Sequence, residues 1–317
     1  MNATPVFIGR EAVECCLKEK WADLVSLIEN ALKSYSQGKV VQPVRSIVSV
    51  DKHNGRLLTM PAYDEDSDSL ATKIATVYPD NKKESIPTIQ TVILLYDASH
   101  GTLKAILYAE IITDMRTAAA SMVATKHLAP KNAQHISILG AGSQARSHYQ
   151  VLKNFVDIKK VSVWNVNKES GEKLAEEIRA SGIQCEYYSS VEYAVKDADI
   201  INVVTMATQP ILMKKWIKEG AHINAVGAPF PDWQELEEDL MHSSVVYVDS
   251  YEGAKKESGD IIKSGAEIYA EIGEVVSGTK KAYPEKTTIF KSLGMAVEDV
   301  VAAEFVYKIY SQLQTIF

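Results

Sequence analysis

The sequence has few cysteines, no excess of positive charge and no long apolar run. Only Cys15, Cys16 and Cys185 occur among 317 residues, and their spacing builds neither a disulfide framework nor a metal site. A net charge of −7 disfavours nucleic-acid backbones and anionic membrane surfaces as partners. The apolar runs fall short of the ~18 residues that a transmembrane helix needs. We therefore expect a globular protein of the reducing cytoplasm.

The hydrophobic pattern changes twice along the chain and predicts three parts. Residues 1–115 open with helical spacing and continue as short strand-like segments with turns at "KHNG" and "ASHG", which predicts an antiparallel sheet with helices beside it. An Ala-rich helix is expected over residues 114–128. Within residues 116–292, strand and helix patterns alternate, which is typical of a Rossmann-type doubly wound parallel sheet. Residues 293–317 are helical and are expected to return to the first part, so the predicted fold class is α/β with a discontinuous α+β domain.

A glycine-rich turn lies in "HISILGAGSQARSH", from His135 to His148. Gly140, Gly142 and Ala145 fit the spacing G-x-G-x-x-[GA] between a strand and a helix. Gly140 would allow the tight turn and Gly142 the close approach of a pyrophosphate, while the helix start would offer N–H groups to the anion. The turn predicts a dinucleotide site, against the alternative of a corner that binds nothing.

The end of the next strand leaves the choice of dinucleotide open. An acidic residue there favours NAD and an arginine favours NADP, but this sequence has Asn165, followed by Val166, Asn167 and Lys168. Asparagine can bond a hydroxyl or a phosphate oxygen. Lys168 could attract a phosphate or could simply be a solvated lysine at a helix start. NADH and NADPH are therefore both candidates.

Three basic residues stand among apolar or small neighbours, namely Arg45, Lys73 and Arg116. Each could be the structural partner of a carboxylate. Together they suggest a site for a small carboxylate, because arginine binds carboxylates bidentately and a desolvated lysine can donate or accept a proton. By contrast, Ser121 has no His/Asp pattern around it that would indicate a nucleophile, and His222 is expected in the core.

Several of these stretches resemble the ornithine cyclodeaminase/mu-crystallin family over nearly the whole chain. They include "QPVRSIVSV", "MPAY", "TKIAT", "TDMRTAAAS" and "FKSLGMAVEDVVAAEFVY". The resemblance implies a homodimer in which the first part and the C-terminal helix form the dimerisation and substrate domain. Within the family, "PDWQELEEDLM" resembles the mu-crystallin branch, whose members are NAD(P)H-dependent ketimine reductases and also bind thyroid hormone.

The resemblance also assigns roles to individual residues. It implies that Lys73 lies beside the reacting C–N centre, that Arg45 and Arg116 hold the substrate carboxylate, and that Glu257 lies near the ligand pocket. The expected cofactor contacts are Thr88, Gly140, Gly142, Ser143, Gln144, Asn165, Val166, Asn167, Lys168, Thr205, Met206, Val226 and Ser292.

Two departures from the family pattern narrow the function. Pro229 stands where cyclodeaminases and the related alanine dehydrogenases carry a reactive aspartate, and Val166 stands where NADPH-preferring relatives carry an arginine. We therefore expect hydride transfer from NADPH or NADH to the C=N bond of a cyclic ketimine carboxylate, with Lys73 as the catalytic residue. The alternatives are an opine-type dehydrogenase that joins pyruvate to an amino acid or taurine, a thyroid-hormone-binding (iodothyronine-binding) or lens structural protein, and, less favoured, an ornithine cyclodeaminase.

Overall fold

A computed structural model describes residues 4–316, and the chain divides into two compact units. Unit 1 joins the chain up to Arg116 with the chain from Met295 onward, and unit 2 is Thr117–Gly294. The first boundary falls directly after Arg116, so this arginine shares a unit with Lys73. Within residues 4–316, no helix combines the length and apolar character that crossing a membrane requires.

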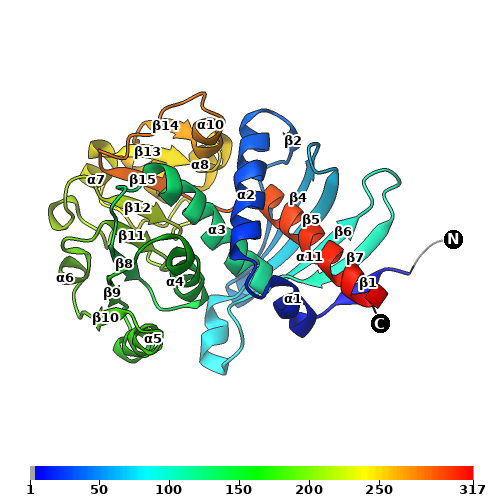
Figure 1. Ribbon diagram of the computed structural model, residues 1–317, viewed down its shortest axis with the longest axis horizontal. Coiled ribbons are helices and arrows are strands. Elements are labelled where there is room, and N and C mark those ends of the chain that lie inside the picture. Colours follow the sequence, from blue (N-terminus) through cyan, green and yellow to red (C-terminus); the bar gives the residue numbers. More distant parts are fainter. Residues whose placement is uncertain (1–3, 317) are drawn as a thin grey trace. The chain divides into compact units, whose positions relative to one another are not determined.

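Unit 1 consists of a twisted sheet and three helices that pack on it (Figure 1). In chain order its elements are β1 (Val6–Ile8), α1 (Arg10–Leu17), α2 (Trp21–Ser36), β2 (Val40–Val41), β3 (Ser46–Val50), β4 (Gly55–Asp64), β5 (Ser69–Val77), β6 (Ile89–Tyr96), β7 (Leu103–Tyr108) and α11 (Ala296–Ile316).

The sheet of unit 1 is a meander, as predicted. Its order is β1-β7-β6-β5-β4-β2, with β3 paired to β4, and every pair is antiparallel except β1 with β7. Asn54 in "KHNG" and Gly101 in "ASHG" have positive φ, which the tight turns between β3 and β4 and between β6 and β7 use.

The C-terminal helix α11 packs on the meander. It contacts β4, β5 and β6 on one side and α2 on the other (Figure 1). Residues of β5 alternate along the strand, so that Ala71, Lys73 and Ala75 are buried while Leu70 and Thr72 stay partly exposed. Lys73 therefore occupies a position that alternation would otherwise give to an apolar residue.

Unit 2 begins within a long helix, α3 (Glu110–Leu128), which starts four residues before the predicted Asp114. The Ala-rich pattern begins only after Arg116, but Glu110 in the first turn favours a helix start there, since a carboxylate stabilises a helix N-terminus. The following elements are β8 (His135–Leu139), α4 (Ser143–Phe155), β9 (Lys160–Trp164), α5 (Lys168–Ala180), β10 (Gln184–Tyr187), α6 (Val191–Val195), β11 (Ile200–Val203), β12 (His222–Ala225), α7 (Glu238–Ser243), β13 (Val245–Val248), α8 (Tyr251–Glu257), α9 (Gly259–Ser264), β14 (Ile268–Glu271), α10 (Ile272–Val276) and β15 (Thr288–Lys291).

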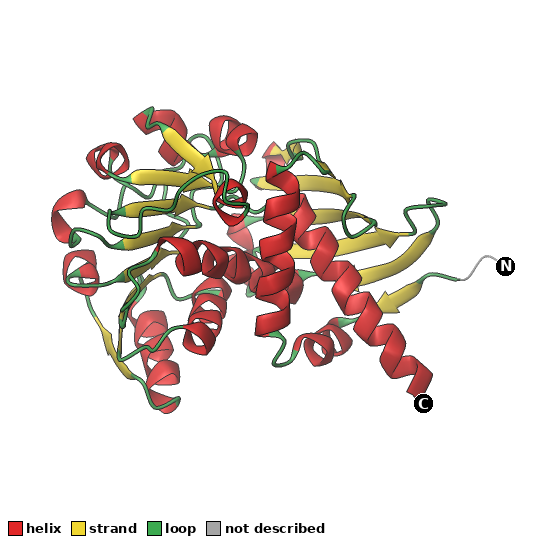
Figure 2. Cartoon of the chain, turned by 45° about the horizontal axis from the view of Figure 1, so that its top comes forward, coloured by secondary structure: helices red, strands yellow, loops and turns green. Residues whose placement is uncertain are grey.

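The predicted Rossmann-type sheet is confirmed. Within residues 117–294, eight strands pair in the order β10-β9-β8-β11-β12-β15-β13-β14, and each pairing is parallel. The central strands β11, β12 and β15 are buried along their length, and helices lie on both faces of the sheet (Figure 2). His222 on β12 is a fully buried core residue, as expected.

The segment "PILMKKWI" is irregular within the otherwise alternating unit 2. It forms a single bridge between Leu212 and Leu236 and a short 3-10 turn at Lys214–Trp216. Leu212 and Leu236 are both fully buried. The pairing of these two distant residues therefore outweighs the local preference of the segment for a regular helix or strand.

Candidate active site

A buried cluster of charges lies in unit 1 where α11 meets β5. Lys73 reaches from the covered face of the sheet, and its Nζ atom is 2.6 Å from Oδ2 of Asp299 in the first turn of α11. The two side chains are 4% and 1% exposed. A lysine buried this completely needs a partner of opposite charge, and Asp299 is that partner.

Arg116 of α3 joins the same cluster. Its Nε donates to Oδ1 of Asp299 at 2.9 Å, and its Nη1 donates to Oε2 of Glu298 at 2.7 Å. The two oxygens of Asp299 thus bind two different cations. The start of α11 is held in place by Gln42, whose Oε1 accepts from the backbone N–H of Val297 at 2.9 Å.

The cluster changes the proton affinity of Lys73. Burial is the main cause that lowers its pKa to about 8; the positive charge of Arg116 adds to this, Asp299 opposes it, and Arg45 lowers it further. For Arg116, burial disfavours the charged form, but Asp299 and Glu298 outweigh burial and raise the pKa, so the guanidinium stays charged. Lys73 is therefore the group of this cluster that can exchange a proton near neutral pH.

The structure brings together two of the three predicted basic residues and places the third within electrostatic reach. Arg45 lies half-buried in the loop between β2 and β3, close enough to influence Lys73. The sequence interpretation missed Glu298 and Asp299. The signal is present in "MAVEDVVAA", where two acidic residues interrupt an apolar helix.

In unit 2 the glycine turn has the geometry that a pyrophosphate requires. Gly140 has φ +119°, and a Cβ atom there would lie 2.7 Å from the carbonyl oxygen of Val204. Gly142 is the N-cap of α4, and within residues 4–316 no side chain caps it and nothing lies within 4 Å of the position of a Cβ. Ala145 is fully buried, as close packing of α4 on the sheet demands. The turn thus fits a dinucleotide.

Most of the expected cofactor residues lie at one edge of the parallel sheet. They follow the carboxyl ends of β8, β9, β11, β12 and β15, which are neighbours in the sheet, and this edge is where doubly wound sheets bind ligands. The residues gathered there are Gly140, Gly142, Ser143, Gln144, Asn165, Val166, Asn167, Lys168, Thr205, Met206, Val226 and Ser292.

Ser292 and the remaining expected site residues differ in their surroundings. Ser292 is 1% exposed, and its Oγ atom has no hydrogen-bond partner among the described residues. Glu257 ends α8 and is buried, in unit 2. Thr88 lies in unit 1 before β6, where its carbonyl accepts from Tyr78 N–H. Ser292 therefore offers an unused hydroxyl at the sheet edge.

Polar groups in the loop after β9 form hydrogen bonds within the loop and with the start of α5. Asn167 Oδ1 accepts from Ser170 N–H at 2.8 Å and caps α5, and Asn165 Nδ2 donates to the Asn167 carbonyl at 2.9 Å. Lys168 lies 3.6 Å from Glu172, while Val166 is 88% exposed. The side chain of Asn167 is thus explained by helix capping.

Arg146 braces the glycine turn, a role that the sequence interpretation did not assign. Its Nη1 donates to the carbonyls of Ala141 and Gly142 at 2.7 and 3.2 Å, and its Nε and Nη2 bond the Glu177 carboxylate at 2.7 and 2.8 Å. A bidentate pair of this kind fixes the guanidinium. Arg146 therefore ties the turn to α5.

A second buried charged network lies where β11, β12 and β15 end. Lys291 donates to the carbonyl of Gly227 and to Oδ2 of Asp260, the latter at 2.8 Å. Asp260 Oδ1 accepts from the backbone N–H of Glu235 at 2.8 Å. Glu235 Oε1 accepts from Thr205 N–H at 3.0 Å and from the Thr205 hydroxyl. The network joins three strand ends through groups that are fully or largely buried.

Burial also changes the ionisation of Glu235. Burial raises the pKa of this carboxyl group to about 8, against the opposing effect of Lys291 and the Thr205 hydroxyl, while Asp260 raises it further. Its Oε2 atom has no hydrogen-bond partner among the described residues. A Cβ atom at Gly227 would overlap the Glu235 carboxylate, so a larger residue there would displace this side chain.

Ser121 has a buried histidine beside it in the fold. His148 Nε2 lies 2.8 Å from the Ser121 hydroxyl, and His148 Nδ1 is 2.7 Å from the carbonyl of Gln144. Both side chains are buried, and burial lowers the pKa of His148 to about 4. A neutral, buried pair with no carboxylate in these bonds ties α4 to α3 and is not the arrangement of an activated nucleophile.

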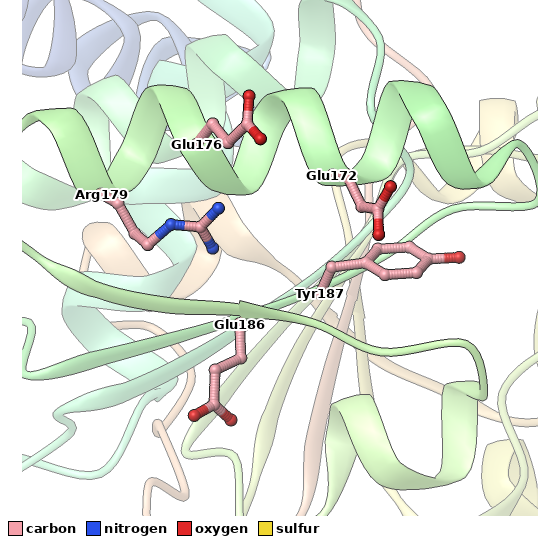
Figure 3. Close-up of a pocket in the computed structure, with 5 residues that line it drawn as sticks. All are labelled: Glu172, Glu176, Arg179, Glu186 and Tyr187. Carbon is pink, nitrogen blue, oxygen red and sulfur yellow. The ribbon is translucent and has the colours of Figure 1, made fainter.

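A surface groove of about 330 Å³ lies between α5 and β10 and has the wrong charge for a dinucleotide (Figure 3). It is lined by Glu172, Glu176, Arg179, Glu186 and Tyr187. Arg179 bonds the Cys185 carbonyl at 3.0 Å, and Glu186 points away from the helix. Three carboxylates against one arginine would repel phosphates.

Comparison with known proteins decides the relationship. The sequence profile of the Ornithine cyclodeaminase/mu-crystallin family matches residues 6–313. The chain belongs to this family. It is similar to the "Ketimine reductase mu-crystallin" of Rattus norvegicus, with 49% identity over 98% of this chain and 99% of the relative. The resemblance found in the sequence is thereby confirmed.

Solved structures of family members share the whole fold. A Δ1-pyrroline-2-carboxylate reductase of Thermococcus litoralis, in complex with NADH and L-proline, is 37% identical and superposes with a TM-score of 0.93 over 98% of both chains. An archaeal alanine dehydrogenase dimer with bound NAD is 28% identical, with a TM-score of 0.92 over 98% of this chain and 97% of that one. Both structures carry the type of cofactor that the glycine turn predicts.

Proposed function

We propose that the chain is an NAD(P)H-dependent reductase of cyclic ketimine carboxylates. The observation that carries the proposal is the buried cluster of unit 1, in which Lys73 and Arg116 share Asp299. A proton-exchanging lysine beside a permanently charged arginine suits a substrate that has both a carboxylate and an imine. The names of the relatives, which are reductases of such imines, support it.

Each group of unit 1 takes a defined role in this reaction. Arg116, with Arg45, would bind the substrate carboxylate and so orient the imine carbon. Lys73 would hold a proton at Nζ and give it to the imine nitrogen, which makes the neighbouring carbon more electrophilic. When bound, the nicotinamide supplies the hydride. The product gains one C–H and one N–H bond and becomes a cyclic imino acid.

Cofactor binding is assigned to the sheet edge of unit 2. Gly140 and Gly142 would let the pyrophosphate approach, and Asn165 would bind the adenosine ribose. Arg146 pairs with Glu177, and Lys168 lies near Glu172, so both nearby cations have carboxylates beside them. We therefore propose NADH as the preferred cofactor, since the extra phosphate of NADPH would meet these carboxylates.

The same assignment favours reduction over deamination. Pro229, which follows Gly227 and Ala228 at the end of β12, has no ionisable group. Hydrolytic deamination needs a base that activates water or an amine. Among the three basic residues assigned to the substrate, Lys73 is the one that can exchange a proton near neutral pH, which suffices for reduction of an imine.

We propose that the functional assembly is a homodimer formed through unit 1. The sheet face opposite α11 bears apolar side chains at positions paired across strands, such as Ile74, Val92 and Leu94. Val92 is 37% exposed and Val48 is 58% exposed. Exposed apolar side chains on a sheet face are typical of a subunit interface. Light scattering on the purified chain tests the assembly.

The decisive experiment is a substrate panel followed by the absorbance of the reduced cofactor. NADH and NADPH are each offered with piperideine-2-carboxylate and pyrroline-2-carboxylate, with pyruvate plus amino acids or taurine, and, in the oxidised form, with ornithine. We expect turnover of the cyclic ketimines, with a higher kcat/KM for NADH. Reaction only with pyruvate and amines would favour the opine-type dehydrogenase, and ammonia release from ornithine would favour the cyclodeaminase. Tight binding of an iodothyronine without any turnover would replace the enzymatic assignment.

A further inference from the structure

We propose that Asp299 is the positioning residue of the proposed reduction. It holds the side chains of Lys73 and Arg116 at a fixed distance and orientation, so that both can act on the same substrate molecule. This inference rests on the proposed function and adds a residue that the sequence interpretation did not include. Asp299 touches neither cofactor nor substrate in this assignment, and it acts through the two cations that it bridges.

The bridging geometry is the first observation. Asp299 Oδ2 lies 2.6 Å from Lys73 Nζ, and Oδ1 accepts from Arg116 Nε at 2.9 Å. Glu298 takes Nη1 of the same guanidinium at 2.7 Å. These bonds use the Nε donor and one of the two Nη1 donors, so the second Nη1 donor and those of Nη2 are left by the two carboxylates for a ligand. Asp299 thereby fixes the direction in which Arg116 faces and its distance from the Lys73 proton.

The second observation is that Asp299 itself is rigidly held. It stands in the first turn of α11, where the helix N-terminus stabilises a carboxylate. Gln42 binds the backbone N–H of Val297 two residues earlier, and Asp299 is 1% exposed. A carboxylate anchored through a helix start and two cations has little freedom to move.

The third observation is the charge that faces Lys73. Across the sheet its neighbours are Met60 on β4 and Ile93 on β6, which are apolar. Arg116 from α3 and Arg45 from the loop before β3 lower the pKa of Lys73, and Asp299 from α11 raises it. Without Asp299, Lys73 would face two cations and would lose its proton at lower pH.

A second ion pair of α11 lies outside the cluster and serves as a comparison for Asp299. Glu304 pairs with Lys104 at 2.9 Å, but the two side chains are 12% and 25% exposed. Its second contact is the exposed Lys308 of the same helix, at 3.7 Å. Glu304→Gln is therefore the matched control, because it removes a carboxylate from α11 without touching the cluster.

The test compares Asp299→Asn, Asp299→Glu and Glu304→Gln with the wild type in the full chain. Turnover of piperideine-2-carboxylate with NADH is measured from pH 6 to 10 and reported as kcat, KM for each substrate and the pH profile. We expect Asp299→Asn to lower kcat by about 10- to 100-fold, to leave KM for NADH within about two-fold, and to move the alkaline limb of kcat to lower pH. Asp299→Glu should keep the alkaline limb and still lose kcat, because its charge is retained but displaced. Glu304→Gln should match the wild type.

Several results would overturn the inference. One is wild-type kcat and pH profile in Asp299→Asn; another is an equal loss in Glu304→Gln, which would indicate a general effect on α11. Should Asp299→Asn not fold, as judged from its melting curve, wild-type kcat in Asp299→Glu would refute a positioning role by itself. If the wild type turns over none of the ketimines, the proposed function fails, and that outcome is distinct from a failure of Asp299 alone.

Discussion

The two units bury charged networks that differ in which group is disfavoured in its charged form. In unit 1, Lys73 and Arg116 share the carboxylate of Asp299, and Arg45 adds a further positive influence on Lys73. In unit 2, Lys291 is bound by Asp260 and by a carbonyl, while the carboxyl of Glu235 lies close by. In unit 1 the charged form of Lys73 is disfavoured. In unit 2 the charged form of Glu235 is disfavoured.

This difference shows which network is suited to a ligand. Burial and the neighbouring arginines lower the pKa of Lys73 to about 8, so this lysine can exchange a proton with a ligand near neutral pH. The network around Lys291 instead joins three strand ends of the parallel sheet and is closed by hydrogen bonds to backbone groups. We therefore assign chemistry to the first network and support of the sheet edge to the second.

The largest expected effect is that of Lys73→Met on activity. Removing the proton donor should lower kcat for ketimine reduction by about 10²- to 10⁴-fold. Methionine resembles lysine in length and fits the apolar neighbours Met60 and Ile93. Asp299 keeps Arg116 as its partner, so no buried charge is left alone. Steady-state rates at pH 7 check the prediction, and an unchanged kcat would show that Lys73 is not catalytic.

The same variant should not lose stability. Because the folded-state pKa of Lys73 is about 8, below its ordinary 10.5, the charged lysine costs about 3 kcal/mol below pH 8, and this cost disappears as pH rises from 8 to 10.5. Lys73→Met should thus be at least as stable as the wild type at pH 7, by urea denaturation. A clear loss of stability would mean that the lysine serves the fold.

The next effect concerns Asp260→Asn in the second network. The amide can still accept from the Glu235 and Leu236 N–H groups, but Lys291 loses its only carboxylate bond among the described contacts. Leaving a fully buried lysine without its counter-ion should destabilise unit 2 by about 3–5 kcal/mol. The shift of the urea midpoint measures this, with the exposed Asp232→Asn as the control. An equal shift in both variants would argue against the network.

Local pattern was sufficient for the architecture and for part of the site. The antiparallel strands of unit 1 and the glycine turn after β8 follow from the local hydrophobic pattern and from backbone sterics, and both were predicted. Lys73 and Arg116 stood out because each is charged in apolar surroundings. The role of Asp299, by contrast, depends on a contact between distant parts of the chain. Asp299 meets Lys73 only because α11, which begins after residue 295, packs on a strand more than 200 residues earlier.

The network of unit 2 escaped the sequence interpretation for the same reason. Glu235, Asp260 and Lys291 come from three segments, and nothing local to any of them indicates that their side chains meet. "TIFKSLG" does place a lysine at the end of an apolar strand, which was the same signal that drew attention to Lys73. Consistent use of that signal would have added Lys291 to the candidates, though not its partners.

The smallest expected effect is that of Glu235→Gln, and its sign opposes that of Asp260→Asn. The pKa of Glu235 is about 8 in the folded chain against an ordinary 4.5, so the protonated form is favoured and stability falls as pH rises from 4.5 to 8. Glutamine keeps an oxygen for Thr205 and carries no charge, so it should raise stability by about 1–3 kcal/mol at pH 7 and by nothing near pH 4. Urea denaturation at both pH values, with the exposed Glu219→Gln as control, measures the difference. A variant that is less stable at pH 7 would show that the ionised carboxylate is needed by Lys291, and the contrast between the two networks would then fail.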